Sequence, residues 1–209
     1  MKTAAFRHKA PIEFGVAMMT LPGQTQCGDL HLVKLFPGGG LVAAVDGSGY
    51  GEEASGAATL AVATLDRHAQ EDLIALVKRC HEELKRTRGA VMSLASFNSS
   101  KNSMTWLGVG SVEGRLLRAR GHSGPPHEVL LQRAGIVGYK LPALQTTVIP
   151  VSRGDTLIFT TDGIDNRFAG DVRLGEPPRS MAQRICSRYC KGTDDALVLV
   201  VRYLGGGEP

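Results

Sequence analysis

Four acidic positions stand next to apolar runs that have the length of β-strands. Asp46 follows the run Leu41–Val45, and Asp162 follows the run in "RGDTLIFTTD". Asp29 precedes another run, and the pair Asp194–Asp195 opens "DDALVLVV". Because strands are rigid supports, these carboxylates would form one cluster if the strand ends meet. Such a cluster of like charges is unfavourable unless cations compensate it.

Oxygen atoms are the donors that this cluster offers. They are hard ligands, which favour Mg²⁺, Mn²⁺ or Ca²⁺ over Zn²⁺. Gly47, which follows Asp46, would let its backbone carbonyl approach an ion directly. A single Asp-Gly pair after a strand is usually only a turn. Two such pairs, with acids before two further strands, indicate a binuclear metal site.

Length, composition and charge fit one globular domain and exclude several function classes. The chain has 209 residues, of which 43% are hydrophobic and 21% charged. No apolar run reaches the roughly 18 residues of a membrane span, and the N-terminus lacks the apolar segment of a signal peptide. The net charge of +4 comes from dispersed basic residues, without the stripe typical of nucleic-acid binding. We therefore expect a cytoplasmic protein without membrane or nucleic-acid partners.

The four cysteines are scattered along the chain, which predicts reduced thiols rather than disulfides. Cys186 and Cys190 are four residues apart and would share one helix face. No further ligands stand at a spacing typical of zinc sites. Packing on a buried helix face is therefore the better interpretation of this pair.

The hydrophobic pattern predicts many short strands, with helices in separate places. The order of these elements is that of an α+β protein, in which two facing sheets with helices on their outer faces would bury the strands. We expect a single domain over residues 1–204 and a flexible tail over residues 205–209. Strands are predicted over residues 13–19, 32–36, 41–46, 91–98, 104–110, 112–119 and 127–131, before Asp162 and after Asp195. Helices are predicted over about 52–69, 71–88 and 179–189.

The motifs resemble those of the metal-dependent protein phosphatases of the protein phosphatase 2C (PP2C) type. "VDGSG" at 45–49, "TTDGI" at 160–164 and "DDALVLVV" at 194–201 occur in the order of that family. "RGHSGPP" at 120–126 and "RGDTLIFTTDG" resemble the compact bacterial branch that includes SpoIIE, RsbU and RsbX. The resemblance covers about residues 24–203. In its short length the chain is most similar to the stressosome feedback phosphatases of this branch.

The resemblance implies a four-layer αββα sandwich with two Mn²⁺ or Mg²⁺ ions at one edge of the paired sheets. Asp46 is expected to bridge the two ions. Asp162 and Asp194 are expected to complete the ligands of the first ion, and Asp29 and the Gly47 carbonyl those of the second. Asp46 and Asp162 would be the catalytic acids. No substrate-binding residue is assigned.

Asp195 lies beside a ligand and is expected to support the site without binding the ions itself. Other positions depart from the family pattern. Ser48 stands where many eukaryotic relatives have a histidine that is proposed as general acid. Gln24 and Gln26 stand where those relatives have a phosphate-binding arginine. His122 is a candidate for protonating the leaving group, although a loop histidine is more often structural.

The resemblance also implies an activity: hydrolysis of phosphoserine or phosphothreonine without a covalent intermediate. In such sites two metal ions lower the pKa of a shared water and neutralise charge on the phosphoryl oxygens. The expected substrate is a phosphorylated STAS-domain scaffold protein of the stressosome, which would make the protein a negative-feedback regulator of the bacterial stress response. Two alternatives remain open. One is an RsbU-like phosphatase of an anti-sigma-factor antagonist, and the other is a non-catalytic module that binds a phosphoprotein.

Overall fold

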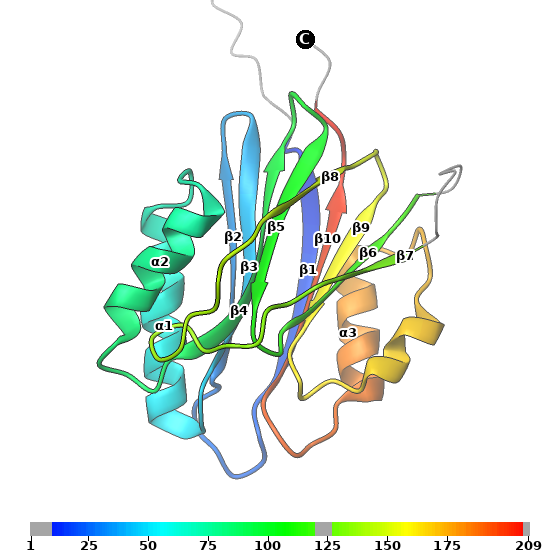
Figure 1. Cartoon of the computed structure of the whole chain (residues 1–209). Coiled ribbons are helices and arrows are strands. Elements are labelled where there is room, and N and C mark those ends of the chain that lie inside the picture. Colours follow the sequence, from blue (N-terminus) through cyan, green and yellow to red (C-terminus); the bar gives the residue numbers. More distant parts are fainter. Residues whose placement is uncertain (1–9, 120–126, 207–209) are drawn as a thin grey trace, which may run out of the picture.

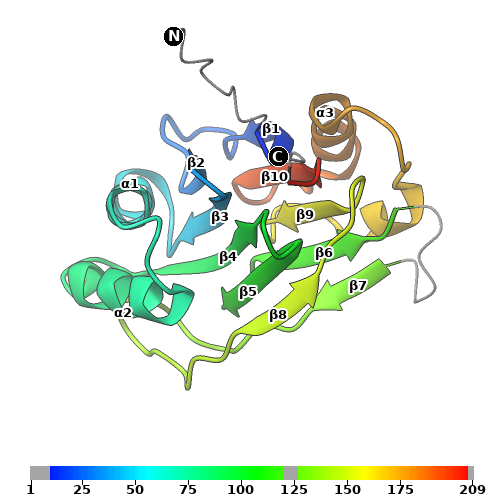
Figure 2. The same ribbon diagram turned by 90° about the horizontal axis from the view of Figure 1, so that it is seen from above.

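The computed structural model describes residues 10–119 and 127–206. Two five-stranded sheets pack face to face, and neighbouring strands in both are antiparallel. Figures 1 and 2 show α1 and α2 on the outer face of one sheet and α3 on the outer face of the other. The predicted α+β fold, a four-layer αββα sandwich, is confirmed. None of the helices in the described ranges has the length and hydropathy of a membrane span.

The sheet beneath α1 and α2 has the strand order β2-β3-β4-β5-β8. Its interior strand β3 is apolar on both faces. Leu41, Ala43 and Val45 pack toward the helices, whereas Val42 and Ala44 pack between the sheets. Successive side chains of a strand alternate between faces, so Asp46 belongs to the face between the sheets. The strands are β2 (Asp29–Phe36), β3 (Gly39–Gly47), β4 (Ala90–Asn98), β5 (Ser103–Val109) and β8 (Thr147–Pro150).

The other sheet has the strand order β1-β10-β9-β6-β7. Its strand β10 is also buried on both faces. Leu197, Leu199 and Val201 pack between the sheets, and Val198 and Val200 pack toward α3. The two-sided burial of β3 and β10 explains why both strands read as continuous apolar runs. The strands are β1 (Ile12–Met19), β6 (Glu113–Leu117), β7 (His127–Leu130), β9 (Thr156–Thr160) and β10 (Ala196–Tyr203).

The helices largely follow the predicted ranges. Small buried alanines bring α1 close to the sheet, as the sequence predicts. Asp72 caps α2 by accepting hydrogen bonds from Ile74 N at 2.8 Å and Ala75 N at 3.4 Å. This cap starts α2 two residues later than predicted, and the helix also ends four residues earlier than predicted, at Leu84. The helices are α1 (Gly51–Arg67), α2 (Leu73–Leu84), the 3-10 helix η1 (Asn166–Asp171) and α3 (Pro178–Tyr189).

Three local predictions differ from the structure. The edge strand β8 and the helix η1 were not predicted; β8 is short and mostly exposed, and therefore has no hydrophobic alternation. Cys190 lies just beyond α3 instead of within it, because its backbone is already extended, with ψ of 128°. Cys186 is buried against the sheet, and all four cysteines are free, as predicted.

Candidate active site

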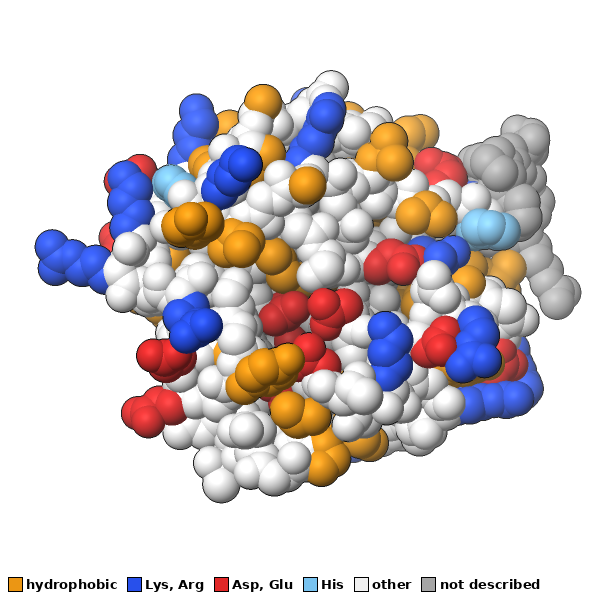
Figure 3. Space-filling view, turned by 60° about the horizontal axis from the view of Figure 1, so that its bottom comes forward, with side chains coloured by type: hydrophobic (Ala, Val, Ile, Leu, Met, Phe, Trp, Pro, Cys, Tyr) orange, Lys and Arg blue, Asp and Glu red, His pale blue; other side chains and the backbone are white. Residues whose placement is uncertain are grey.

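The strand ends that carry the predicted acids meet at one end of the sandwich. Asp29 and Asp46 are directly opposite each other in the antiparallel register of β2 and β3. Asp162 follows β9 and Asp194 precedes β10, so both come from the facing sheet. Figure 3 shows acidic side chains at the centre of this end of the molecule, with basic side chains on both sides. The structure therefore brings together the acids that the sequence singles out.

Two contacts tie the sheets together at this end. Thr161 Oγ1 donates to Asp29 Oδ2 at 2.6 Å and accepts from the Leu197 backbone N–H at 2.8 Å. The Asp195 carboxylate accepts from the backbone N–H groups of Leu21 at 2.7 Å and Gly28 at 2.6 Å. Asp195 thereby holds the segment that leads into Asp29, and its role at a metal site stays a prediction. Thr161 was not singled out from the sequence.

The electrostatics of the cluster are unfavourable as the side chains stand. Asp29 is only 2% exposed. Burial raises its pKa to about 7, to which nearby carboxylates add, although the Thr161 hydrogen bond acts in the opposite direction. Burial and the charge of Asp29 raise the pKa of Asp46 to about 8. Burial also raises the pKa of Asp194. Like charges directly opposite across a ladder destabilise a sheet, so the cluster is in need of a compensating cation.

The donor set fits a divalent ion of the magnesium or manganese class. The cluster offers carboxylate oxygens, and no group in the described ranges donates a hydrogen bond to the Asp46 carboxylate. In the arrangement seen, no three Asp, Glu, His or Cys side chains of the described residues enclose an ion by themselves. Backbone carbonyls or water would therefore complete the ligands of a bound ion.

The glycine after Asp46 is required by helix packing. A Cβ atom on Gly47 would lie 2.0 Å from the backbone oxygen of Ala54, in the first turn of α1. This reason could not be foreseen, because the two residues come together only in the folded chain. The Gly47 N–H donates to the Gly28 oxygen at 3.0 Å. The expected role of the Gly47 carbonyl toward an ion remains a prediction.

Gly47→Ala is expected to destabilise the protein by about 2 kcal/mol, the cost of overpacking a filled site. Its added methyl group meets backbone atoms that cannot move without shifting α1. Gly56→Ala is the matched control, since Gly56 lies in α1 itself and an added methyl group there would meet open space. The control should stabilise α1 by about 0.5–1 kcal/mol. Urea unfolding of both variants checks this, and equal stabilities would contradict it.

The raised pKa values predict a pH dependence for the protein in chelator. Asp29 and Asp46 have folded pKa values of about 7 and about 8, above the value of about 3.9 in an unfolded chain. The folded state therefore binds more protons than the unfolded state between about pH 4 and pH 8, and stability falls as the pH rises. We expect the free energy of unfolding, measured with urea, to be lower at pH 8 than at pH 5 by at least about 2 kcal/mol, the contribution of one such group. Asp46→Asn should lose much of this slope, and an unchanged slope would refute the cause given.

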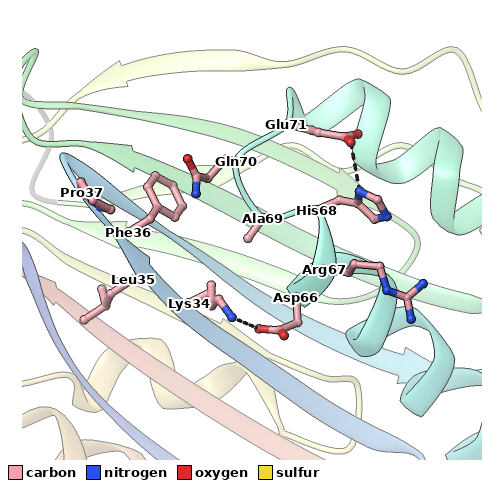
Figure 4. Close-up of a pocket in the computed structure, with 10 residues that line it drawn as sticks. All are labelled: Lys34, Leu35, Phe36, Pro37, Asp66, Arg67, His68, Ala69, Gln70 and Glu71. Carbon is pink, nitrogen blue, oxygen red and sulfur yellow. Dashed lines mark hydrogen bonds and ion pairs between the residues drawn. The ribbon is translucent and has the colours of Figure 1, made fainter.

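A pocket of about 660 Å³ lies away from the acids, between the end of β2 and the connection of α1 to α2. Figure 4 shows its ion pair between Lys34 and Asp66, at 2.9 Å, and the contact of His68 with Glu71, at 3.0 Å. This pocket begins at the far end of β2 from Asp29, about 20 Å along the strand. Lys34 and His68 are paired with acids of the same pocket, and the distance along β2 separates the pocket from the candidate active site.

Other sequence-based candidates have different outcomes. Ser48 follows β3, and its backbone N–H donates to the oxygen of Gly89, just before β4, at 2.9 Å. Gln24 and Gln26 are exposed on the connection between β1 and β2. His122 and the surrounding "RGHSGPP" motif lie outside the described residues.

Comparisons with known proteins agree with the motifs. The family model for Stage II sporulation protein E (SpoIIE) matches residues 37–204. The chain is 27% identical over 150 residues to the phosphoserine phosphatase RsbX of Bacillus subtilis (strain 168), covering 72% of this chain and 73% of RsbX.

Solved structures show the same fold. One comes from work on the bacterial stressosome as a modular system adapted to control secondary messenger signalling. It is 30% identical, with a TM-score of 0.82, over 91% of this chain and 99% of the other. RsbX in complex with magnesium has a TM-score of 0.82 at 22% identity, over 92% and 95% of the two chains; this likeness concerns the fold. The matches confirm the resemblance predicted from the motifs: the chain belongs to the SpoIIE family and is a PP2C-like protein phosphatase.

Proposed function

We propose that the protein is a divalent-metal-dependent serine/threonine phosphatase, with its catalytic domain over residues 1–204. The observation that carries this proposal is the pair formed by the buried Asp29 and the half-buried Asp46, whose pKa values are raised to about 7 and about 8, near Asp162 and Asp194 of the other sheet. These carboxylates stand at the positions of the family motifs. The magnesium bound in the RsbX structure supports the choice of ion.

In this proposal Asp46, Asp162 and Asp194 would hold one Mn²⁺ or Mg²⁺ ion, and Asp46, Asp29 and the Gly47 carbonyl would hold a second. When bound, the ions supply Lewis acidity and lower the pKa of water to near neutrality. The protein fixes the ligands. Thr161 orients Asp29 through its 2.6 Å hydrogen bond, and Asp195 holds the preceding segment.

The reaction requires no cysteine nucleophile. Burial raises the pKa of Cys27 to about 11 and that of Cys80 to about 12, so both thiols are protonated at neutral pH. Cys186 is buried on the sheet side of α3, and burial raises its pKa as well. Alkylation of the accessible thiols is compatible with full activity in this account.

The proposed substrate is phosphoserine or phosphothreonine on a STAS-domain scaffold protein of a cytoplasmic stressosome, which the enzyme would dephosphorylate as negative feedback. Two findings support this choice. The relative RsbX is a phosphoserine phosphatase, and a structure that is 30% identical comes from work on the bacterial stressosome. A phosphorylated anti-sigma-factor antagonist is the alternative substrate within the same chemistry.

Initial rates of phosphate release from the two phosphoproteins, measured with Mn²⁺, test the proposed substrate. We expect faster release from the phosphorylated scaffold protein. Faster release from the antagonist would mean that the antagonist is the substrate, and the proposed metal-dependent hydrolysis would still hold. Binding of a phosphoprotein without release from either one, by folded protein with Mn²⁺ or Mg²⁺, would instead favour a binding module.

A further inference from the structure

A second pocket, of about 310 Å³, opens beside Asp162 at the same end of the sandwich as the acids. Its wall includes the ligand candidate Asp162 together with Lys191, Ser111 and Asn166. These residues come from the segments after β9, before β10 and between β5 and β6. Because the pocket shares Asp162 with the candidate metal site, a substrate that approaches the acids from this side passes Lys191.

Backbone hydrogen bonds fix Lys191 next to Asp162. The Lys191 N–H donates to the Gly163 oxygen at 2.9 Å, and the Asp165 N–H donates to the Tyr189 oxygen at 2.8 Å. The Lys191 side chain folds back in the same direction, since its Nζ donates to the backbone oxygen of Asp162 at 2.6 Å. The ammonium group is thus held at the wall that the pocket shares with the acid cluster.

The charge of Lys191 has no carboxylate partner within the described ranges. Two other acids of the pocket wall are already engaged. Asp165 accepts from Arg167 Nε at 2.9 Å, and Glu113 pairs with Arg115. A lysine ammonium has three N–H donors, and the contact with Asp162 uses one of them. The other two donors are available to an anion in the pocket.

We propose that Lys191 binds the phosphate group of the substrate on the pocket side of Asp162. A phosphorylated side chain that approaches a cluster of carboxylates is repelled, and an adjacent ammonium offsets part of this repulsion. Arg88, near Gly49 at the same end, is engaged differently: it contacts the Glu53 carboxylate at 2.9 Å. The inference rests on the proposed function, because it assigns a binding role within the same site.

The test compares Lys191→Met, Lys191→Arg and the control Lys101→Met, which removes an exposed lysine from the β4–β5 turn at the opposite end. With the phosphorylated scaffold and Mn²⁺, Lys191→Met should raise KM and the inhibition constant of inorganic phosphate about tenfold or more. The effect on kcat should be smaller. Lys191→Arg should recover most of the affinity, and Lys101→Met should match wild type.

Unchanged KM and phosphate inhibition in Lys191→Met, in an enzyme whose wild type turns over, would overturn this inference and leave the proposed function intact. If wild type releases no phosphate, the proposed function fails separately. In that case the affinities of wild type and Lys191→Met for phosphorylated and unphosphorylated scaffold protein are compared, and this comparison tests the role of Lys191. Loss of the preference for the phosphorylated form in Lys191→Met supports the role, and an unchanged preference refutes it. Equal thermal midpoints of the three variants exclude misfolding as the cause.

Discussion

Asp46→Asn is expected to lower Mn²⁺-dependent phosphate release by about 10³-fold or more while leaving the metal-free protein folded. The reason is the position of Asp46 opposite Asp29 and beside the acids of the facing sheet. The variant removes the carboxylate that would bind both of the proposed metal ions. It also removes one charge from a cluster in which like charges repel, so its thermal midpoint in chelator should rise at pH 8.

Activity is expected to fall while the thermal midpoint in chelator rises. Simple damage to the fold would instead lower both. The measurements are phosphate release with Mn²⁺ and thermal unfolding in chelator. Asp66→Asn is the matched control. Asp66 lies in the last turn of α1, forms an exposed ion pair with Lys34 and is far from the acid cluster. The control should retain wild-type turnover. Loss of stability together with loss of activity in Asp46→Asn would contradict the proposed role.

Asp155→Ala is expected to reduce the free energy of unfolding by about 3–5 kcal/mol, because it removes one buried partner of Arg118 and leaves two backbone N–H groups without their acceptor. Asp155 is 1% exposed and contacts Arg118, itself 5% exposed, at 3.0 Å. It also accepts from the backbone N–H groups of Ala119 at 2.7 Å and Ser152 at 3.0 Å. Arg118 further donates to Glu128 at 2.8 Å. The network joins the start of β9 to β6, β7 and the segment after β8.

This second prediction concerns stability alone. Asp155 precedes β9, whereas Asp162 follows that strand, so the two acids lie at opposite ends of it. Activity per folded molecule should therefore change little, provided that the assay temperature lies below the lowered midpoint. Glu82→Ala, which removes an exposed pair with Lys85, should leave stability unchanged. Urea unfolding of both variants decides, and a loss below about 1 kcal/mol for Asp155→Ala would contradict the burial argument.

The features that sequence predicts well are those whose signal is local. β3 and β10 read as apolar runs because both of their faces are buried, and each run carries an acid at its end. The order of the strands and helices was therefore enough to predict two facing sheets, and the resemblance of the motifs to a known family implied that Asp29, Asp46, Asp162 and Asp194 meet. The edge strand β8 lacked such a signal because three of its four residues are exposed.

The features that sequence does not predict depend on contacts between distant residues. Thr161 and its partner Asp29 are 132 positions apart, and Lys191 is 29 positions from Asp162. Gly47 is small because of Ala54, a residue of the following helix. The motifs do not reveal these contacts, although Thr161 lies within one of them. Asp155 likewise lies within "RGDTLIFTTDG", and its contact with the buried Arg118 is seen only in the folded chain.

The central claim is that a divalent ion held by these acids is needed to hydrolyse a phosphoprotein. Its most direct test is phosphate release from a phosphorylated STAS-domain scaffold protein by the wild-type chain, before chelation, after exhaustive chelation and after Mn²⁺ is restored. The account predicts that chelation stops release and that Mn²⁺ restores it. Release that continues unchanged in chelator, or no release by the folded protein with either Mn²⁺ or Mg²⁺, would contradict it.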